Sequence, residues 1–405
     1  MDKAPTSIWL LGGMLAVSPT AAFRADIEIS GDRVRRVVCG NLTETSGSRP
    51  ATAVNLEGYL ILPGLINAHD HLEFNLFPRL GRGPYSNSEE WARDIYQPGC
   101  SPVREHLAVP RAVRLWWGGL KNLLSGVTTV CHHNPYDPLF DAGFPVSVMQ
   151  GYGWAHSIIF ERDVLGAFRA THPDDPFVIH LGEGTDKHSQ NEIFALERMG
   201  ALDCRTVLVH GVAFTETGHA LWQQRGAALV WCPTSNRFTL GTTLDARWVS
   251  RFKRIALGSD SALTARGNLL DELHAAHDEG ATAELIYGMV TESAAEILRL
   301  KKGEGQVLPG SIANLTAIPW RAGTPAEAVV KMGTADVEMV VVSGQLQLAS
   351  DEMAGRWPLP QIEALERISI EGVERRVRAP VSWLLSETSK HLPEGIQLAG
   401  RRVAA

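Results

Sequence analysis

The stretch LPGLINAHDHLEF, residues 62–74, decides how the rest of this 405-residue chain is interpreted. After Pro63 and Gly64 it continues as an apolar run, and it ends in His69 and His71, which are separated by one residue. Side chains two residues apart point to the same face of a β-strand, so one strand end can present both imidazoles to a single metal ion. Two surface histidines near a turn are the alternative, which would be preferred if the motif stood alone.

Four later apolar segments, rich in β-branched residues, carry polar residues that could join such a site. VIHLGEGTD contains His180 and, three residues later, Glu183. TVLVHGV contains His210, ALVWCPTSN ends in Asn236, and IALGSDS contains Asp260. Stretches of helical character lie between these segments, an alternation typical of a parallel sheet built from βα units. Polar groups at the C-terminal ends of parallel strands are typical of a (β/α)8 barrel site.

In this order, the motifs resemble those of the metal-dependent amidohydrolase superfamily, in the mononuclear branch of cytosine deaminase, S-adenosylhomocysteine deaminase and the triazine hydrolases. The resemblance extends from about the N-terminus to about Ser350. It implies an α/β fold with a (β/α)8 TIM-type barrel and a small β-sandwich domain built from N- and C-terminal segments. It also implies these site residues: His69, His71, His180 and Asp260 as metal ligands, Glu183 as the acid of the family's H-x-x-E strand, and His210 as the histidine that assists the attacking water.

The middle of the expected barrel is less clear than the strands that carry the ligands. Residues 125–134 and 144–152 are interpreted as the second and third strands, and the faint fourth strand is placed near residues 154–160. The expected domain boundaries are residues 1–61 and 305–350 for the two halves of the small β-domain, 62–304 for the barrel, and 351–405 for a partly helical tail with a helix near residues 363–378.

The same residue types support hydrolysis on chemical grounds. Three histidines, one carboxylate and a water form an open catalytic metal site rather than a closed structural one. The metal lowers the pKa of its water towards neutrality, to roughly 7 in favourable cases. Asp260 could accept a proton from that water, Glu183 could protonate a ring nitrogen, and His210 could orient the water or stabilise the developing charge.

The expected number of metal ions follows from a missing lysine. Two-metal members of the superfamily commonly bridge their ions with a carboxylated lysine from the fourth strand, and this chain has no lysine between Lys121 and Lys187. Glu161 could replace that bridging lysine, although Glu161 is better interpreted as an acidic residue at the start of a helix. We therefore expect one divalent transition metal, with Zn2+ preferred and Fe2+ or Mn2+ suited to the same ligands.

The composition is that of an enzyme rather than a nucleic-acid-binding protein. The chain has 38 Lys plus Arg against 45 Asp plus Glu and no basic stripe, so we expect a small-molecule substrate and no nucleic acid. The five cysteines are dispersed, which favours reduced thiols in the cytoplasm. The P-C-x-x-C motif of the other zinc-deaminase fold is absent from the sequence. The sequence leaves open whether the protein forms a homo-oligomer.

The N-terminal run IWLLGGMLAV, residues 8–17, permits two interpretations. With the small residues 18–22 it resembles the apolar core and cleavage site of a signal peptide. The charges that flank it offset each other, and it is too short to span a membrane. Together with residues 25–38, which contain a turn at Gly31 and Asp32, it is better interpreted as the first strands of the small β-domain. We therefore expect no membrane association.

Substrate selection is expected from the loops that follow the strands. The longest, residues 78–110, contains Trp91 and Tyr96, whose rings could stack on a planar substrate or pack the loop down. His132 and His133 follow the second strand; one is expected to face the pocket and the other to be structural.

Asn236 and Arg237, at the end of the CPTSN turn, complete the candidate substrate contacts. Arg237 could meet an anionic substituent, and a solvated or capping arginine is the alternative.

Two classes of function fit these observations. The leading hypothesis is hydrolytic deamination of a small nitrogen heterocycle by a metal-activated water. Hydrolysis of a cyclic amide, or of another leaving group on a heterocycle, is the enzymatic alternative. A catalytically silent binding relative is the alternative from another class, and the presence of all six site residues argues against it.

Overall fold

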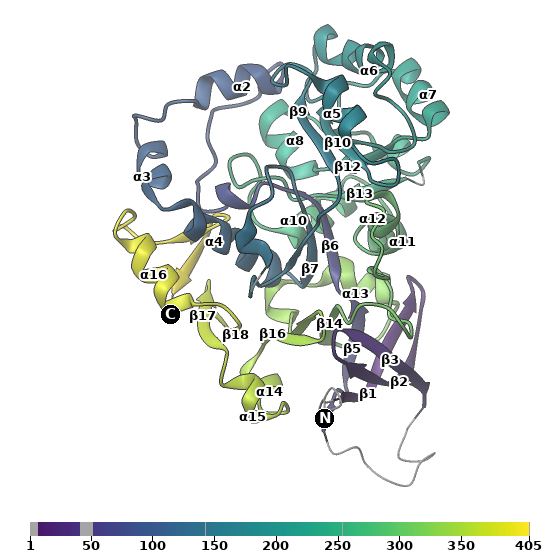
Figure 1. The fold of residues 1–405 in the computed structure, drawn as a ribbon, viewed down its shortest axis with the longest axis vertical. Helices are drawn as coiled ribbons and strands as arrows, with labels where there is room; N and C mark the ends of the chain where they lie inside the picture. Colours follow the sequence, from purple (N-terminus) through teal and green to yellow (C-terminus); the bar gives the residue numbers. More distant parts are fainter. Residues whose placement is uncertain (1–6, 41–51, 142, 253, 405) are drawn as a thin grey trace.

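The computed structural model describes residues 7–40, 52–141, 143–252 and 254–404 (Figure 1). Their strands form one 12-stranded sheet, one five-stranded sheet and one three-stranded sheet. In Figure 1 the large sheet occupies the lower half of the molecule, and most helices lie above it around the two smaller sheets.

The 12-stranded sheet joins the two ends of the chain. Its strand β5 (Tyr59–Pro63) pairs parallel with β1 (Ser7–Ser18) and antiparallel with β14 (Leu315–Pro319). Residues 8–17, which the sequence also allowed as a signal peptide, lie inside β1. The remaining strands are β2 (Ala21–Ser30), β3 (Arg33–Cys39), β4 (Ala53–Asn55), β15 (Met339–Val342), β16 (Gln345–Ala349), β17 (Glu366–Ile370), β18 (Val373–Val377), β19 (Gln397–Leu398) and β20 (Arg401–Ala404).

The two smaller sheets contain only parallel pairs among the described residues. The three-stranded sheet has the order β6 (Leu65–Asp70), β7 (Val127–His132), β8 (Ser147–Val148). The five-stranded sheet consists of β9 (Gly153–Ser157), β10 (Phe177–Leu181), β11 (Thr206–His210), β12 (Ala228–Trp231) and β13 (Ile255–Leu257). The strands that carry the expected ligands are buried along their whole length, as expected for parallel strands covered on both faces.

From β9 to β13 at least one helix lies between each pair of successive strands, which confirms the βα pattern predicted for this part of the chain. The helices include α4 (Arg111–Leu123), α5 (Val164–Ala170), α6 (Lys187–Met199), α7 (Glu216–Arg225), α8 (Pro233–Leu240), α9 (Ala246–Val249), α10 (Leu269–Asp278), α11 (Ala283–Met289) and α12 (Glu292–Ile297), and α13 (Pro325–Lys331) follows β14. The faint fourth strand is β9, which overlaps residues 154–160 but ends at Ser157.

Residues 62–74 contain parts of two strands. Leu62 and Pro63 end β5 and pair with β14, whereas β6 begins at Leu65. Gly64 lies between them, where an added Cβ would come within 2.2 Å of the Thr128 side chain. Only glycine therefore lets the chain pass from the large sheet into the buried strand β6 at this contact.

The expected helix near residues 363–378 is wrong, because this region forms the hairpin of β17 and β18. In β17 the side chains of Ile368 and Ile370 are buried, whereas that of Arg367 is exposed. Buried apolar side chains therefore recur with the period of two that suits a strand. Helices of this region are α14 (Asp351–Ala354), α15 (Leu359–Ile362) and α16 (Val381–Ser389).

Within the described ranges, none of the helices has both the length and the apolar character needed to cross a membrane.

Candidate metal centre and active site

Four of the predicted ligand side chains meet at the ends of parallel strands. His69 lies near the end of β6 and His71 directly after it, His180 lies in β10, and Asp260 follows β13. His180 Nε2 is 3.2 Å from His69 Nε2 and 3.4 Å from His71 Nε2. Asp260 Oδ1 is 3.7 Å from His69 Nε2 and 3.8 Å from His71 Nε2.

These distances fit a divalent metal ion. Ligand atoms about 2.1 Å from a metal in tetrahedral geometry lie roughly 3.4 Å from one another. Neutral imidazole nitrogens that face each other at such distances would repel through their lone pairs, and a cation between them turns that repulsion into coordination. The donor set, three imidazoles and a carboxylate, is also one that binds zinc and related ions.

The three imidazoles favour the neutral form that coordinates a metal. Burial lowers the pKa of His69, and it lowers the pKa values of His71 and His180 well below the usual range. His180 Nδ1 lies 2.7 Å from the backbone oxygen of His156, so Nδ1 carries the proton and Nε2 keeps a free lone pair.

Asp260 is held by groups on the first turn of α8 and on the segment after β13. Its Oδ2 accepts hydrogen bonds from Ser235 Oγ at 2.7 Å and Thr264 Oγ1 at 3.2 Å, and its Oδ1 accepts from the backbone N–H of Ser261 at 2.7 Å. Burial opposes ionisation, but the interaction with His69 brings the pKa of Asp260 well below its ordinary value. The residue has a positive φ of 50°, a strained conformation that is common at functional sites.

His210, the last residue of β11, faces Glu183 across the same site. It also has a positive φ, 79°. Its Nδ1 lies 2.8 Å from Asn236 Oδ1, which fixes the proton on Nδ1 and leaves Nε2 as an acceptor. His210 Nε2 is 3.6 Å from Glu183 Oε2. Asn236, predicted to contact substrate, thus contacts and orients His210.

Glu183 lies in the loop after β10, and its burial raises the pKa of its carboxyl group. A buried carboxyl with a raised pKa can hold a proton near neutral pH and donate it to a substrate. The backbone oxygen of Glu183 accepts a hydrogen bond from the Ser88 N–H at 3.0 Å, which ties this loop to the insertion after β6.

A cavity of about 530 Å³ opens beside these residues. Its polar end is formed by His71, His156, His180, Glu183, His210 and Asp260. The predicted contacts Trp91 and Tyr96 line it as well, and the Trp91 Nε1–H also donates to Leu80 O at 2.9 Å. His156 was not singled out from the sequence, and no local pattern distinguishes it from other histidines that follow strands.

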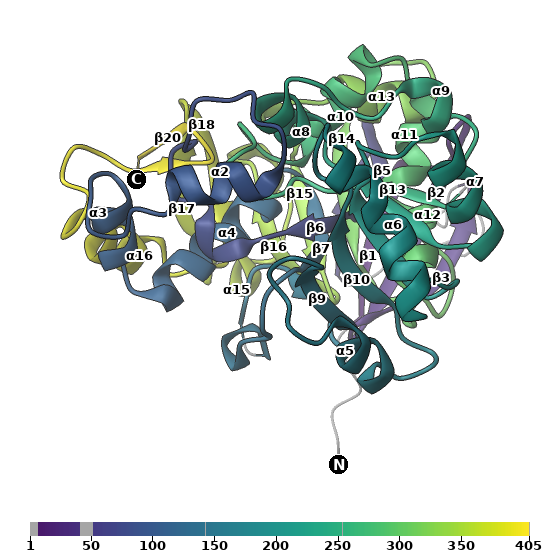
Figure 2. The same cartoon turned by 90° about the horizontal axis from the view of Figure 1, so that it is seen from above.

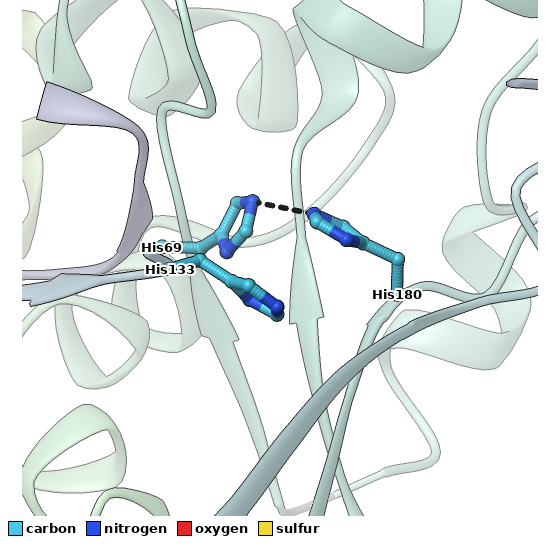
Figure 3. Close-up of side chains that lie close together, drawn as sticks. All are labelled: His69, His133 and His180. Atoms are coloured by element: carbon cyan, nitrogen blue, oxygen red, sulfur yellow. Dashed lines mark hydrogen bonds between the residues drawn. The ribbon is translucent and has the colours of Figure 1, made fainter. Parts of the chain in front are cut away.

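Neither His132 nor His133 lines this cavity, contrary to the expectation that one of them would. His132 Nε2 lies 3.5 Å from Glu73 Oε2. His133 stacks on His180 with ring centroids 4.2 Å apart. Figure 3 shows His69, His133 and His180 directed towards one another, and one nitrogen of each lies within 4.8 Å of the others. His133 is therefore a neighbour of the candidate ligands.

Arg237 does not line the cavity either. Its guanidinium group donates two hydrogen bonds of 2.6 Å to Glu279, and both side chains are partly exposed. A guanidinium already paired with a carboxylate on the outside of the fold is not available to an anionic substituent.

A buried ion pair beneath the candidate centre was not expected from the sequence. Lys121 Nζ, on α4, is 2.9 Å from Asp70 Oδ2 and 2.9 Å from Ser259 Oγ. Asp70 separates the two ligand histidines of β6, and Ser259 precedes Asp260. Lys121 and Asp70 are almost completely buried. The pair therefore joins the two strand ends that present three of the four candidate ligands.

We expect Lys121→Met to destabilise the fold by about 3–5 kcal/mol, because it leaves the buried Asp70 carboxylate without its cation. Urea unfolding followed by circular dichroism measures this loss. Lys301→Met is the matched control, since Lys301 pairs with Asp175 at 2.8 Å on the surface and such pairs contribute about 1 kcal/mol or less. Equal losses in the two variants would contradict the importance of the buried pair.

Comparison with known proteins identifies relatives of this chain. Residues 155–346 match the model of the amidohydrolase family. A 5-methylthioadenosine/S-adenosylhomocysteine deaminase from Syntrophobacter fumaroxidans is 24% identical over 372 residues, covering 74% of this chain and 82% of the relative. A 5'-deoxyadenosine deaminase from Methanothermobacter thermautotrophicus is 23% identical over 370 residues, covering 75% of this chain and 85% of the relative.

Solved structures of similar fold cover almost the whole chain. An adenosine deaminase from Xanthomonas campestris with bound zinc has a TM-score of 0.75 at 16% identity, covering 97% of this chain and 99% of that one. A variant of the atrazine chlorohydrolase from Arthrobacter aurescens, complexed with zinc and atraton, has a TM-score of 0.71 at 17% identity, covering 95% and 100%. The fold is of the TIM-barrel type found in these hydrolases, and residues 155–346 are similar to the amidohydrolase family.

Proposed function

We propose that this protein is a metal-dependent hydrolase of C–N bonds that deaminates a small nitrogen heterocycle. The observation that carries the proposal is that a buried acid, Glu183, and a carboxylate, Asp260, line the same cavity. They lie beside three imidazoles whose nitrogens face one another. Relatives named as deaminases of adenosine derivatives support the same reaction.

In this proposal His69, His71, His180 and Asp260 hold one divalent metal. When bound, such a metal polarises water and so supplies a nucleophile near neutral pH. Zinc is the proposed ion, supported by the zinc in the two structures of similar fold, with Fe2+ or Mn2+ as alternatives.

The protein's own groups would move the protons. Asp260 accepts the proton that the attacking water loses, since its lowered pKa keeps it ionised. Glu183 donates a proton to the ring nitrogen beside the attacked carbon, so that negative charge does not accumulate there. His210, fixed by Asn236, orients the water by accepting a hydrogen bond from it at Nε2. The amino group takes the proton that Asp260 received and leaves as ammonia, and the remaining hydroxyl proton returns to Glu183 as the carbonyl forms.

We expect the isolated protein to hold close to one metal ion per chain. His180 Nε2 lies within 3.4 Å of the Nε2 atoms of both His69 and His71, and Glu161, the alternative bridge, accepts a hydrogen bond from the Arg162 N–H at its Oε1. Elemental analysis of the purified protein measures the stoichiometry. Two tightly held ions per active chain would contradict the mononuclear proposal and make Glu161 a candidate ligand.

We also propose that β6 to β13 close into one (β/α)8 barrel within residues 62–304. Support comes from the backbone N–H of Asp260, which donates to His69 O at 3.1 Å and so connects the two sheets at one seam. At the other seam His133 Nε2 lies 3.0 Å from Ala155 O of β9. The small β-sandwich would comprise residues 1–61 and 305–350, and buried residues of both ranges, such as Leu10 and Leu315, belong to one apolar cluster.

A different leaving group is the second candidate, because one structure of similar fold is an atrazine chlorohydrolase. A panel of aminated purines, pyrimidines, pterins and triazines, assayed for ammonia and for loss of the starting ring, distinguishes deamination from other hydrolysis. Ring consumption without ammonia would favour the second candidate. No turnover with metal bound would favour a silent binding relative.

We propose a cytoplasmic enzyme that acts on a small molecule. All five cysteines are unpaired, which fits a reducing compartment. A homo-oligomer stays a prediction that sedimentation of the purified protein would test.

A further inference from the structure

The cavity beside the candidate centre is polar at one end only. Most of the remaining wall comes from the insertion between β6 and α4, which contributes the apolar side chains Phe74, Phe77, Trp91, Ile95, Val103 and Leu107. The insertion includes two helices, α2 (Ser88–Ile95) and α3 (Val103–Ala108), which Figures 1 and 2 show on the face of the molecule away from the first strands of the large sheet.

The apolar faces of these helices have little protein packed against them. Trp91 and Ile95 lie one turn apart on α2, Val103 and Leu107 lie one turn apart on α3, and all four line the cavity. Yet neither helix contains a buried residue. An amphipathic helix normally buries its apolar face against the core. Here the two faces border open space instead.

Exposed apolar residues gather at the same cavity. Tyr96 is 80% exposed, Leu107 41% and Phe160 48%, and all three line it. They come from three separate segments, which makes chance clustering a poor explanation. Apolar side chains that converge on a concave surface mark a site where an apolar group binds.

Helix α2 is fixed to the loop that carries Glu183. The Thr185 N–H donates to Ser86 O at 2.8 Å, and the Asn87 side chain donates to Asp186 Oδ2 at 2.6 Å. Together with the bond between the Ser88 N–H and Glu183 O, these contacts hold the apolar wall at a set position relative to the proposed acid. A substrate with its ring at Glu183 would extend its substituent along α2.

No lysine or arginine lines the cavity among the residues that the structure describes. Two arginines of the insertion pair within it, Arg93 with Glu89 and Arg104 with Glu105. An anionic substituent that lies along α2 and α3 would therefore lose its hydration without gaining a lysine or arginine partner.

We propose that the substrate is a neutral nitrogen heterocycle that carries an apolar substituent, and that α2 and α3 select this substituent. The inference rests on the proposed function for the identity of the ring. Its own content is the chemistry of the substituent, which is alkyl or aryl rather than anionic, zwitterionic or a free polyol.

Two adenines of matched chain length test the inference by binding. We expect 9-butyladenine to bind the metal-loaded protein about 10- to 100-fold more tightly than 9-(3-carboxypropyl)adenine, because only the butyl group gains from burial against the apolar wall. Isothermal titration calorimetry measures both dissociation constants. Equal affinities, or no binding of either compound, would overturn the inference.

Two substitutions assign the preference to the helices. The variant with both Ile95→Ser and Leu107→Ser should lose most of the preference while the affinity for the carboxylate changes little. Neither side chain is buried, so the fold should be unaffected. Leu359→Ser is the matched control, since Leu359 is 73% exposed on α15 and outside the cavity. A preference that survives the double substitution would overturn the role of α2 and α3.

An ammonia assay on the same compounds separates the inference from the proposed function. Preferential binding of the butyl compound without ammonia release from it or from the wider panel would leave the inference standing and defeat deamination. Ammonia release at equal kcat/KM from both compounds would support deamination and overturn the inference.

Discussion

Glu183→Gln is expected to lower kcat by about 10²- to 10⁴-fold, the usual contribution of a general acid. An aromatic C=N carbon is attacked readily only when the ring nitrogen is protonated as electrons move onto it. Glu183 lines the cavity with a raised pKa, and a glutamine there cannot donate a proton of comparable acidity. Steady-state kinetics on the best substrate of the panel measure the loss.

The same variant should keep its metal and its thermal stability. Glutamine has nearly the shape of a protonated glutamic acid, so a carboxyl whose raised pKa reflects burial is replaced at little cost. Glu192→Gln is the matched control: Glu192 is also a buried carboxyl, with a pKa raised by burial to about 7, but it accepts a hydrogen bond from Gly182 and does not line the cavity. We expect it to change kcat little.

Near-wild-type turnover of Glu183→Gln on the physiological substrate would exclude ring protonation by this residue. A non-aromatic amide substrate would then be the better hypothesis, since its attack needs no acid at a ring nitrogen. His132 faces Glu73 rather than the cavity, so it is a poor replacement as the acid.

The proposed ligands were predictable because local spacing determines their geometry. His69 and His71 lie two residues apart at the end of β6, and His180 is the penultimate residue of the buried parallel strand β10. The β-strand period and the rule that parallel strands collect their C-terminal ends at one edge are enough to bring such residues together. Neither rule needs knowledge of distant contacts.

The remaining features depend on contacts between distant segments. Lys121 pairs with Asp70 across 51 positions of sequence, and a lysine on a helix gives no sign that it is buried. Arg237 forms an ion pair with Glu279, which lies at the C-terminal end of α10. Which of two adjacent histidines faces a cavity depends on how the chain turns after the strand, and here neither His132 nor His133 does.

Asp260→Asn alone should lower kcat at least as much as Glu183→Gln, since it weakens coordination and also removes the proton acceptor.

Removing two of the proposed ligands should abolish metal retention. We expect Asp260→Ala combined with His180→Ala to yield protein with well below one metal ion per chain after gel filtration, because only His69 and His71 of the proposed set remain. For this double variant, His219→Ala is the control for nonspecific destabilisation: His219 is buried on α7, stacked on Trp248, and lies outside the cavity. It should keep its metal. A double variant that retains one ion per chain would show that the ligand set is wrong, and His133, whose ring nitrogen lies within 4.8 Å of nitrogens of His69 and His180, would become the next candidate.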